Sequence, residues 1–208
     1  MIRAIVLAAG ASSRMGSAKA ALLLGQTGET LVGRVVRTLL DGGVPDVSVV
    51  AGAHIDAVRR AMPPHERRAR VIEHPGWQDG QLSSLLAGLA AIDDQLLEAA
   101  LVTLVDVPLV RPATVAAVIA AWRRTRAPIV RPARDDRHGH PVIFDRAVFA
   151  DLRAADPGEG AKAIFARYRD RIHNVDVEDE GAFIDIDTPG EYQRIVNSWA
   201  ESPGRGSA

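Results

Sequence analysis

The sequence predicts an α/β fold in which a mostly parallel sheet lies between two layers of helices. Short apolar runs alternate along the chain with stretches of helical periodicity, which is typical of right-handed strand–helix–strand units. The first apolar run, residues 4–7, leads into a loop of small residues, as in sheets that bind ligands at the carboxyl ends of their strands. From about residue 129 the strands follow one another more closely, so we expect a mixed sheet there.

Composition is consistent with one domain. The chain has 208 residues, 47% of them hydrophobic, which is enough for one sizeable core. Its 25 basic and 26 acidic residues give a net charge of −1, so no basic field favours nucleic acid or a membrane as a partner. No cysteine is present, which excludes disulfides and thiolate metal sites. We find no signal peptide and no membrane span, so we expect a cytoplasmic protein.

We expect one domain over residues 1–200 and a flexible tail over 201–208. In the first part of the chain, predicted strands and helices alternate regularly. Thr30 is the candidate N-cap of the first helix. Strands are predicted at residues 4–7, 47–50, 71–72 and 101–105. Helices are predicted over residues 31–40 and 55–62, from after Gly80 to about 92, and over 112–124.

The second part predicts shorter elements. Strands are predicted at residues 129–130, 142–144, 172–175 and 184–186, short helices near 146–152 and 161–168, and a polar loop over 134–140. The final helix begins with a capping box, in which Thr188 is the cap, Pro189 is the first helical residue and Glu191 lies three residues on.

The loop after the first strand carries the most specific motif. Residues 8–13 are all Ala, Gly or Ser, so a ligand can lie against backbone N–H groups that bind phosphate oxygens. Two cations, Arg14 and Lys19, follow and suit a polyphosphate. The spacing of Gly10 and Gly16 fits neither the Walker loop nor the dinucleotide-binding fingerprint. The alternative is a plain glycine-rich turn.

Asp106 directly follows the most continuous apolar strand. A carboxylate at the end of a buried strand is costly unless it is paired or binds a metal, and Mg²⁺ prefers one or two carboxylates together with phosphate oxygens. The alternative is an Asp that caps the turn before Pro108. With a phosphate loop also present, we expect Asp106 to bind Mg²⁺.

Asp185 and Asp187 alternate with two isoleucines, so both carboxylates lie on one face of the predicted strand. We expect Asp187 to be the second metal ligand, with Asp185 as the fallback. The alternative for Asp187 is a supplementary N-cap beside Thr188.

Two further segments contain candidate binding residues. Gly80, Ser83 and Ser84 open a helix, and they can donate hydrogen bonds to a base edge or a phosphate, although either serine could simply be the N-cap. The polar loop contains Arg137, His138 and His140. Without cysteine or a nearby acidic ligand of metal spacing, these histidines do not predict zinc.

The run L-A-A-G-x-S-x-R-M-G-x-x-K, from Leu7 to Lys19, resembles the N-terminal signature of the nucleotidyltransferases related to the molybdenum-cofactor guanylyl- and cytidylyltransferases. The resemblance implies a Rossmann-like, nucleotide-diphospho-sugar-transferase-like sheet in a three-layer α/β/α domain. It also implies that residues 8–10 approach the base and that Arg14 and Lys19 hold the triphosphate. Asp106, with its D-x-P turn, and residues 185–192 resemble the metal-binding Asp and the D-x-D-T-P-x-D/E-Y ending of that family. Nucleotide-binding residues are expected to be Leu7, Ala8, Ala9, Gly10, Arg14, Lys19, Gly80, Ser83 and Ser84.

Later motifs resemble the cytidylyltransferase branch of that family. They are G-x-x-S-S-L-x-x-G-L at residues 80–89, G-H-P-V-x-F at 139–144, and G-E-G-A-K at 158–162. In the last motif the branch has Asp and Arg where this chain has Glu159 and Lys162, and Ala18 stands where the family often has Pro or Asp. By resemblance, the acceptor contacts Gly139, His140, Pro141 and Lys162.

Together these motifs predict an Mg²⁺-dependent enzyme that transfers a nucleoside monophosphate to a phosphorylated acceptor and releases pyrophosphate. By resemblance the donor is CTP and the acceptor molybdopterin, and a molybdenum hydroxylase is a candidate partner. Arg14, Lys19 and Asp106 are the expected catalytic residues, and Lys19 is expected to be solvent-accessible. The alternatives are a sugar-1-phosphate nucleotidyltransferase and a non-catalytic accessory that delivers a nucleotide or cofactor to a molybdenum enzyme.

Overall fold

An eight-stranded mixed sheet forms the centre of the molecule. The computed structural model describes residues 1–25, 28–158 and 160–200, so the predicted tail and Glu159 lie outside the described residues. The strand order is β3-β2-β1-β4-β7-β5-β6, and β8 also pairs with β5. The strands are β1 (Ile2–Ala8), β2 (Val47–Ala51), β3 (Ala69–Glu73), β4 (Ala99–Leu104), β5 (Ile129–Arg134), β6 (Arg137–His138), β7 (Val142–Asp145) and β8 (Ile172–Asp176).

The sheet is parallel in its first half and mixed in its second, which confirms the prediction. β1 runs parallel to both β2 and β4, with Val6 opposite Val49 on one side and Thr103 on the other. β7 is antiparallel to β4 and to β5, whereas β8 is parallel to β5. The carboxyl ends of β1, β2 and β4 therefore meet at one edge of the sheet, where open α/β folds bind ligands.

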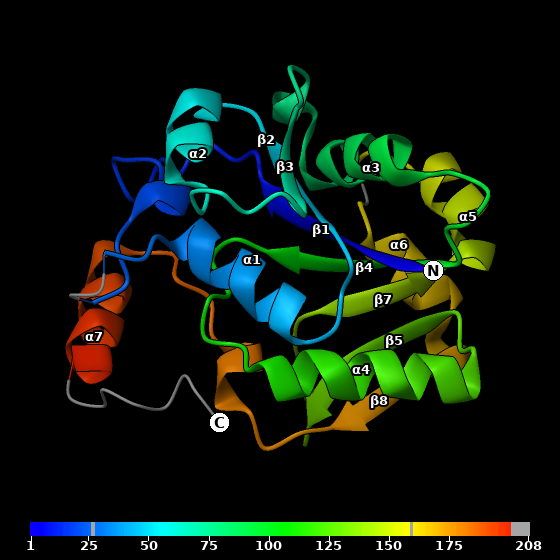
Figure 1. Ribbon diagram of the computed structural model, residues 1–208. Coiled ribbons are helices and arrows are strands. Elements are labelled where there is room, and N and C mark those ends of the chain that lie inside the picture. The colour runs from blue at the N-terminus through cyan, green and yellow to red at the C-terminus, as the bar shows by residue number, and fades with distance from the viewer. Residues whose placement is uncertain (26–27, 159, 201–208) are drawn as a thin grey trace.

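Helices cover both faces of this sheet, so the predicted three-layer architecture is also confirmed (Figure 1). One buried cluster joins the sheet to α1 and α4, and the other joins it to α3, α5 and α6. Ile5 and Val6 on β1 point into opposite clusters and are both fully buried, as expected for a strand covered on both faces. The helices are α1 (Leu31–Asp41), α2 (Ile55–Ala61), α3 (Gln81–Ile92), α4 (Pro112–Thr125), α5 (Phe149–Ala154), α6 (Lys162–Arg167) and α7 (Pro189–Ala200).

Both predicted helix caps are present. The Thr30 side chain accepts a hydrogen bond from the Gly33 N–H at 3.0 Å and caps α1. At α7 the Glu191 N–H donates to Thr188 Oγ1 at 3.3 Å, and Glu191 Oε2 accepts from the Thr188 N–H at 2.8 Å. This reciprocal pair is the capping box that the sequence predicts.

Two predicted segments differ from the structure. Residues 184–186 do not form a strand, because the Ile186 N–H donates to the Asp106 carbonyl at 2.8 Å instead of to a neighbouring strand. The predicted polar loop at 134–140 contains the short strand β6, which pairs with the end of β5.

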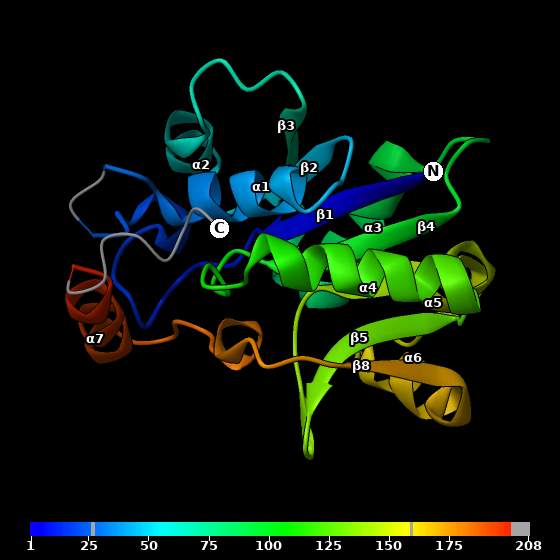
Figure 2. The ribbon, with the colours of Figure 1, turned by 60° about the horizontal axis from the view of Figure 1, so that its bottom comes forward.

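Helix α7 packs near the edge of the sheet where the carboxyl ends of β1, β2 and β4 meet. Figure 2 shows it beside the loop that follows β1, at the opposite end of the molecule from α5 and α6. The Tyr192 hydroxyl donates to the Leu23 carbonyl at 2.6 Å, and Tyr192 packs with Ile195 against a small buried cluster of Leu24, Leu31 and Ile186. None of the described helices combines the length and the apolar character that crossing a bilayer requires.

Candidate functional site

The loop after β1 is held by its own backbone and by α2. Ser12 has φ of +51°, and its carbonyl accepts from the Met15 N–H at 2.9 Å, so the loop turns before Arg14. Ser12 Oγ accepts from the Lys19 N–H at 3.2 Å. His54 Nε2, beside α2, lies 2.9 Å from the Ala11 carbonyl. A Cβ added at Gly10 would meet nothing within 4 Å, so this part of the loop faces open space.

Lys19 joins the loop to two carboxylates from distant parts of the chain. Its Nζ donates to Asp106 Oδ2 and to Asp187 Oδ1, each at 2.9 Å. The Lys19 side chain is only 11% exposed, so the expectation that it is solvent-accessible is wrong. The two carboxylates attract the Lys19 ammonium group, so the Lys19 side chain turns inward at the end of β4.

Backbone contacts fix the two carboxylates beside each other. The Asp106 carbonyl accepts from the Ile186 N–H, which ties the turn after β4 to the segment before α7. The Asp187 N–H in turn donates to Glu191 Oε2 at 2.9 Å. The capping box therefore both starts α7 and orients Asp187. Asp185 is exposed, and no ion pair involves it in the described part of the chain.

Arg14 completes a group of four charged residues. Its guanidinium lies 3.1 Å from Asp187 Oδ2, while its side chain is 71% exposed. Burial alone would lower the pKa of Lys19. The hydrogen bonds that Lys19 donates to Asp106 and Asp187, together with the negative charges of these carboxylates, outweigh burial and raise the pKa. The hydrogen bond from Lys19 lowers the pKa of Asp187, with a smaller contribution from Arg14. Both shifts favour the charged forms of Lys19 and Asp187.

A divalent metal fits this arrangement of carboxylates. Asp106 and Asp187 already converge on one cationic atom, and Asp106 Oδ1 is buried without a hydrogen-bond partner among the described residues. The described residues contain no group of three His, Asp or Glu side chains that could hold a metal alone. Two carboxylates completed by phosphate oxygens are what Mg²⁺ prefers.

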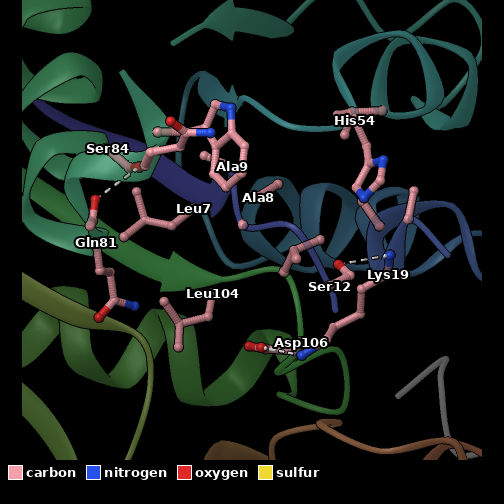
Figure 3. A pocket seen from close by; sticks show the side chains of 18 residues that line it. Leu7, Ala8, Ala9, Ser12, Lys19, His54, Gln81, Ser84, Leu104 and Asp106 are labelled. Atoms are coloured by element: carbon pink, nitrogen blue, oxygen red, sulfur yellow. Dashed lines mark hydrogen bonds and ion pairs between the residues drawn. The ribbon is translucent and has the colours of Figure 1, made fainter. Parts of the chain in front are cut away.

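A cavity of about 350 Å³ opens beside this charged group (Figure 3). The predicted residues Leu7, Ala8, Ala9, Gly10, Lys19, Gly80, Ser84 and Asp106 line it. Figure 3 shows Lys19 and Asp106 in contact at one side, and Gln81 at the other with its amide near Leu104. His54, Trp77 and Gln81 also line this first cavity. Sequence reasoning missed these three residues. Only Gln81 had a signal, because it lies between Gly80 and the two serines of the predicted binding segment.

The two predicted serines occupy different positions. Neither is the N-cap of α3, because that position belongs to Gly80, which has φ of +96° and no side chain. Ser83 Oγ donates to the Gly80 carbonyl at 2.8 Å and lies 3.0 Å from His74 Nε2. Ser83 does not line the first cavity, whereas Ser84 does. Gly88, from the same motif, has a packing role, because an added Cβ would lie 2.6 Å from Ile5 Cγ2.

A second, larger cavity of about 770 Å³ adjoins the first. The two cavities share the lining residues Leu7, Gln81 and Leu104. Of the predicted acceptor residues, Gly139, His140 and Lys162 line the second cavity. Pro141 instead lies against a small void near α4. Phe144, the last residue of the motif at 139–144, also lines the second cavity, and so do Arg131 and Phe165, which sequence reasoning missed.

His140 is the predicted acceptor residue with the most constrained surroundings. Its N–H donates to the Ala182 carbonyl at 2.9 Å, and a Cβ added at the preceding Gly139 would lie 2.3 Å from that same oxygen. Burial lowers the pKa of His140, opposed by a hydrogen bond to the Val102 backbone and by the charges of Asp106 and Asp185. Its Nδ1 is buried and has no partner among the described residues.

Comparison with known proteins gives consistent matches along the chain. Residues 4–172 match the family described as MobA-like NTP transferase domain. Nicotine blue oxidoreductase of Paenarthrobacter nicotinovorans is 30% identical over 203 residues, which cover 94% of this chain and 96% of the relative.

Solved structures extend this result. Rv0371c from Mycobacterium tuberculosis superposes with a TM-score of 0.79 at 27% identity, covering 95% of this chain and 98% of that one. Another structure of Rv0371c is a complex with manganese. A nucleotidyl transferase from Methanothermobacter thermautotroptrophicus has a TM-score of 0.80 at 25% identity, covering 97% and 98% of the two chains.

Proposed function

We propose a function that starts from an established premise: the chain belongs to the family of MobA-like NTP transferase domains. Within that nucleotidyltransferase family, this chain transfers a nucleoside monophosphate to a phosphate of an organic acceptor and releases pyrophosphate. CTP is the favoured donor, and an acceptor of the molybdopterin type is favoured. The choice of CTP rests on the L-A-A-G run at residues 7–10, and the choice of acceptor rests on the motifs at residues 80–89 and 139–144.

The observation that carries this proposal is the convergence of four charged side chains at one edge of the first cavity. Lys19 contacts Asp106 and Asp187, and Arg14 contacts Asp187. Neither a glycine-rich turn nor a turn-capping Asp needs a buried lysine between two carboxylates. Two cations beside two carboxylates suit a triphosphate with a divalent metal.

Asp106 and Asp187 would hold the metal, which in phosphoryl transfer neutralises charge on the phosphates. Residues 8–10 line the first cavity, and a Cβ added at Gly10 would meet nothing within 4 Å, so the nucleotide can lie against the loop there. Arg14 and Lys19 would stabilise the charge that develops on the departing pyrophosphate. An acceptor phosphate is already an anion and needs no general base, so catalysis by this chain is positioning and charge stabilisation.

The comparisons also support a second candidate function. The relative that matches nearly the whole chain is named an oxidoreductase of nicotine blue, and the second cavity is wide and partly lined by aromatic rings. A dye-like planar molecule could be reduced there by an added reductant. Two bifunctional GlmU proteins from Anaeromyxobacter are 36% identical over 135 residues, but the chain spans about a quarter of their length. A sugar 1-phosphate remains the alternative acceptor that the sequence predicts.

Pyrophosphate release tests the proposed function directly. Purified protein is incubated with Mg²⁺, each of CTP, GTP, ATP and UTP, and either molybdopterin or a sugar 1-phosphate. We expect acceptor-dependent release with CTP and molybdopterin. Nucleotide binding without release would support the accessory alternative, and bleaching of nicotine blue with NADH or NADPH, but no release, would support the oxidoreductase.

Asp185→Asn and Asp187→Asn then separate the two candidates for the second metal ligand. Of these two aspartates only Asp187 contacts Lys19, so we expect Asp187→Asn to lower the rate of pyrophosphate release by at least about a hundredfold, equivalent to about 2.7 kcal/mol. A larger loss in Asp185→Asn would transfer the assignment to Asp185.

A further inference from the structure

Arg131 lies in an unusual electrostatic setting on β5. It shares a face with Ile129, and that face packs toward α6. Its Nε donates to Asn174 Oδ1 at 3.0 Å, and its guanidinium lies 5.4 Å from the centre of the Phe165 ring. No carboxylate pairs with it in the described part of the chain. Burial alone lowers the pKa of Arg131, because no nearby negative charge offsets the loss of water.

Two further basic residues line the second cavity with Arg131. They are His138 on β6 and Lys162 at the start of α6. Neither forms an ion pair with any described residue. Burial lowers the pKa of His138, and the positive charge of Arg131 lowers it further against an opposing effect of Asp136. Arg131 and Lys162 therefore create a positive potential that the described protein atoms leave largely uncompensated, and His138 beside them favours its neutral form, which can still donate a hydrogen bond.

Arg134 provides an internal comparison on the same strand. It lies three residues after Arg131, faces the other side of β5, and pairs with Glu180 at 2.7 Å. Arg137, on β6, pairs with the same carboxylate at 2.8 Å. Arginines of this hairpin thus have acidic partners where they face away from the cavity, and Arg131 has none where it faces the cavity.

The remaining wall of the second cavity is apolar. Phe144 and Phe165 meet edge to face, with ring centroids 5.8 Å apart, and Val102 and Val142 lie beside them. Such a surface holds the carbon skeleton of a ligand, since apolar pockets with a few placed polar groups are typical of small-molecule sites. The cavity meets the first one at Leu7, Gln81 and Leu104.

We propose that Arg131, assisted by Lys162 and His138, binds an anionic group of the acceptor that is distinct from the group that reacts. The reacting group must reach Lys19 and Asp106, which line the first cavity only, whereas Arg131 lines the second only. The acceptor is therefore an organic anion with a carboxylate or phosphate at one end, an apolar body on the phenylalanines, and its nucleophile at the other end. The term acceptor rests on the proposed function, but the anion site does not.

Direct binding of model compounds tests the anion site without nucleotide or metal. The probes are 2-naphthyl phosphate and 2-naphthoate, with neutral 2-naphthol for comparison, and binding is measured by calorimetry. We expect both anions to bind at least about tenfold more tightly than 2-naphthol. Arg131→Gln should reduce that preference to about twofold or less. Lys162→Gln should weaken anion binding about threefold, and because Lys162 is exposed, this variant should keep the fold.

Two control variants locate the probe. Arg134→Gln, on the same strand but paired with Glu180, should leave anion binding within twofold of the unchanged protein. Arg14→Gln, which removes a cation that pairs with Asp187 and does not line the second cavity, should also leave anion binding unchanged. Equal binding of anionic and neutral probes, full binding by Arg131→Gln, or loss of binding in Arg14→Gln would each overturn the proposal.

The result is separable from the proposed function. If 2-naphthyl phosphate binds through Arg131 but no nucleotide releases pyrophosphate, the anion site stands and the transferase proposal fails. If pyrophosphate is released but binding of the anionic probes does not depend on Arg131, the transferase proposal stands and the anion site fails. When transfer is observed, Arg131→Gln should raise the KM of an anionic acceptor by about tenfold and change kcat little, because Arg131 does not reach the reacting atoms.

Discussion

The two neighbouring cavities differ in how their basic side chains are paired. In the first cavity Lys19 lies between Asp106 and Asp187 and is almost fully buried. In the second cavity Arg131 and Lys162 have no acidic partner among the described residues. The two cavities adjoin at Leu7, Gln81 and Leu104, so the paired and the unpaired basic side chains lie in neighbouring parts of the fold.

The difference indicates two kinds of charge recognition. Asp106, Asp187 and Lys19 together carry a net negative charge, with Arg14 near the solvent, so a bare triphosphate would meet repulsion unless a cation came with it. The second cavity is already positive and suits an anion alone. A paired group can exchange its partners when a metal and phosphates arrive, whereas unpaired cations select a ligand by its own charge.

Asp106→Asn should give the largest effect, because it removes one of the two carboxylate charges that contact Lys19 at the side of the first cavity. The variant keeps the shape of the side chain, but a metal loses a charged ligand where phosphates need neutralising. We expect pyrophosphate release to fall by at least about a thousandfold, equivalent to about 4 kcal/mol. The rate is measured across a magnesium titration, beside the melting temperature of the metal-free protein.

A matched control for this prediction is Asp56→Asn, on the exposed surface of α2. It should leave both the rate and the melting temperature unchanged. Unchanged activity in Asp106→Asn at limiting magnesium would show that Asp106 only caps the turn before Pro108, since Asn and Asp serve nearly equally there.

Local signals predicted much of this fold because they depend on neighbours in sequence. The caps at Thr30 and Thr188 need only their own first helical turns, and both are present. The alternating pattern at residues 184–186 predicted a strand wrongly, since alternation does not say whether a partner strand is available. There the Asp106 carbonyl accepts the Ile186 N–H instead.

The charge pairing could not be predicted, because it depends on contacts across the whole chain. Lys19 and Asp106 are 87 positions apart, and Lys19 and Asp187 are 168 apart. The sequence indicated these residues as candidates but not that Lys19 would be buried between them. Arg131 belongs to no motif. Its only signal was an arginine at the inward-facing position of an apolar strand, two residues after Ile129.

Lys19→Ala should have the next largest effect, and on stability as well as on activity. Its removal leaves Asp106 and Asp187 facing each other without the ammonium group between them, and only Asp187 keeps a cation, Arg14, so we expect a loss of about 1–3 kcal/mol in the free energy of unfolding. Adding Mg²⁺ should recover part of this loss, because a divalent cation replaces the ammonium group. Thermal melts with and without Mg²⁺ measure both quantities.

Lys162→Ala is the control that sharpens the comparison between cavities. Lys162 is exposed and unpaired in the described structure, so its loss should change the free energy of unfolding by less than about 0.5 kcal/mol, with no added response to Mg²⁺. Equal stability of the two lysine variants would contradict the difference in pairing.

Among the variants that affect the group of Arg14, Lys19, Asp106 and Asp187, Thr188→Ala should have the smallest effect on the rate. It tests whether the helix cap positions Asp187. Loss of an N-cap side chain costs about 1 kcal/mol, and the capping box also holds Asp187 through Glu191. Thr30→Ala is the matched control, because it removes the same residue type from the cap of α1, where no carboxylate of the charged group is attached. We expect a larger loss of stability in Thr30→Ala, because the Thr30 hydroxyl also donates to the Ala61 carbonyl at 2.6 Å, but a fall in the rate of pyrophosphate release, of about three- to tenfold, in Thr188→Ala alone. Equal rates in the two variants would mean that Asp187 is placed by the Ile186–Asp106 backbone contact and not by the cap.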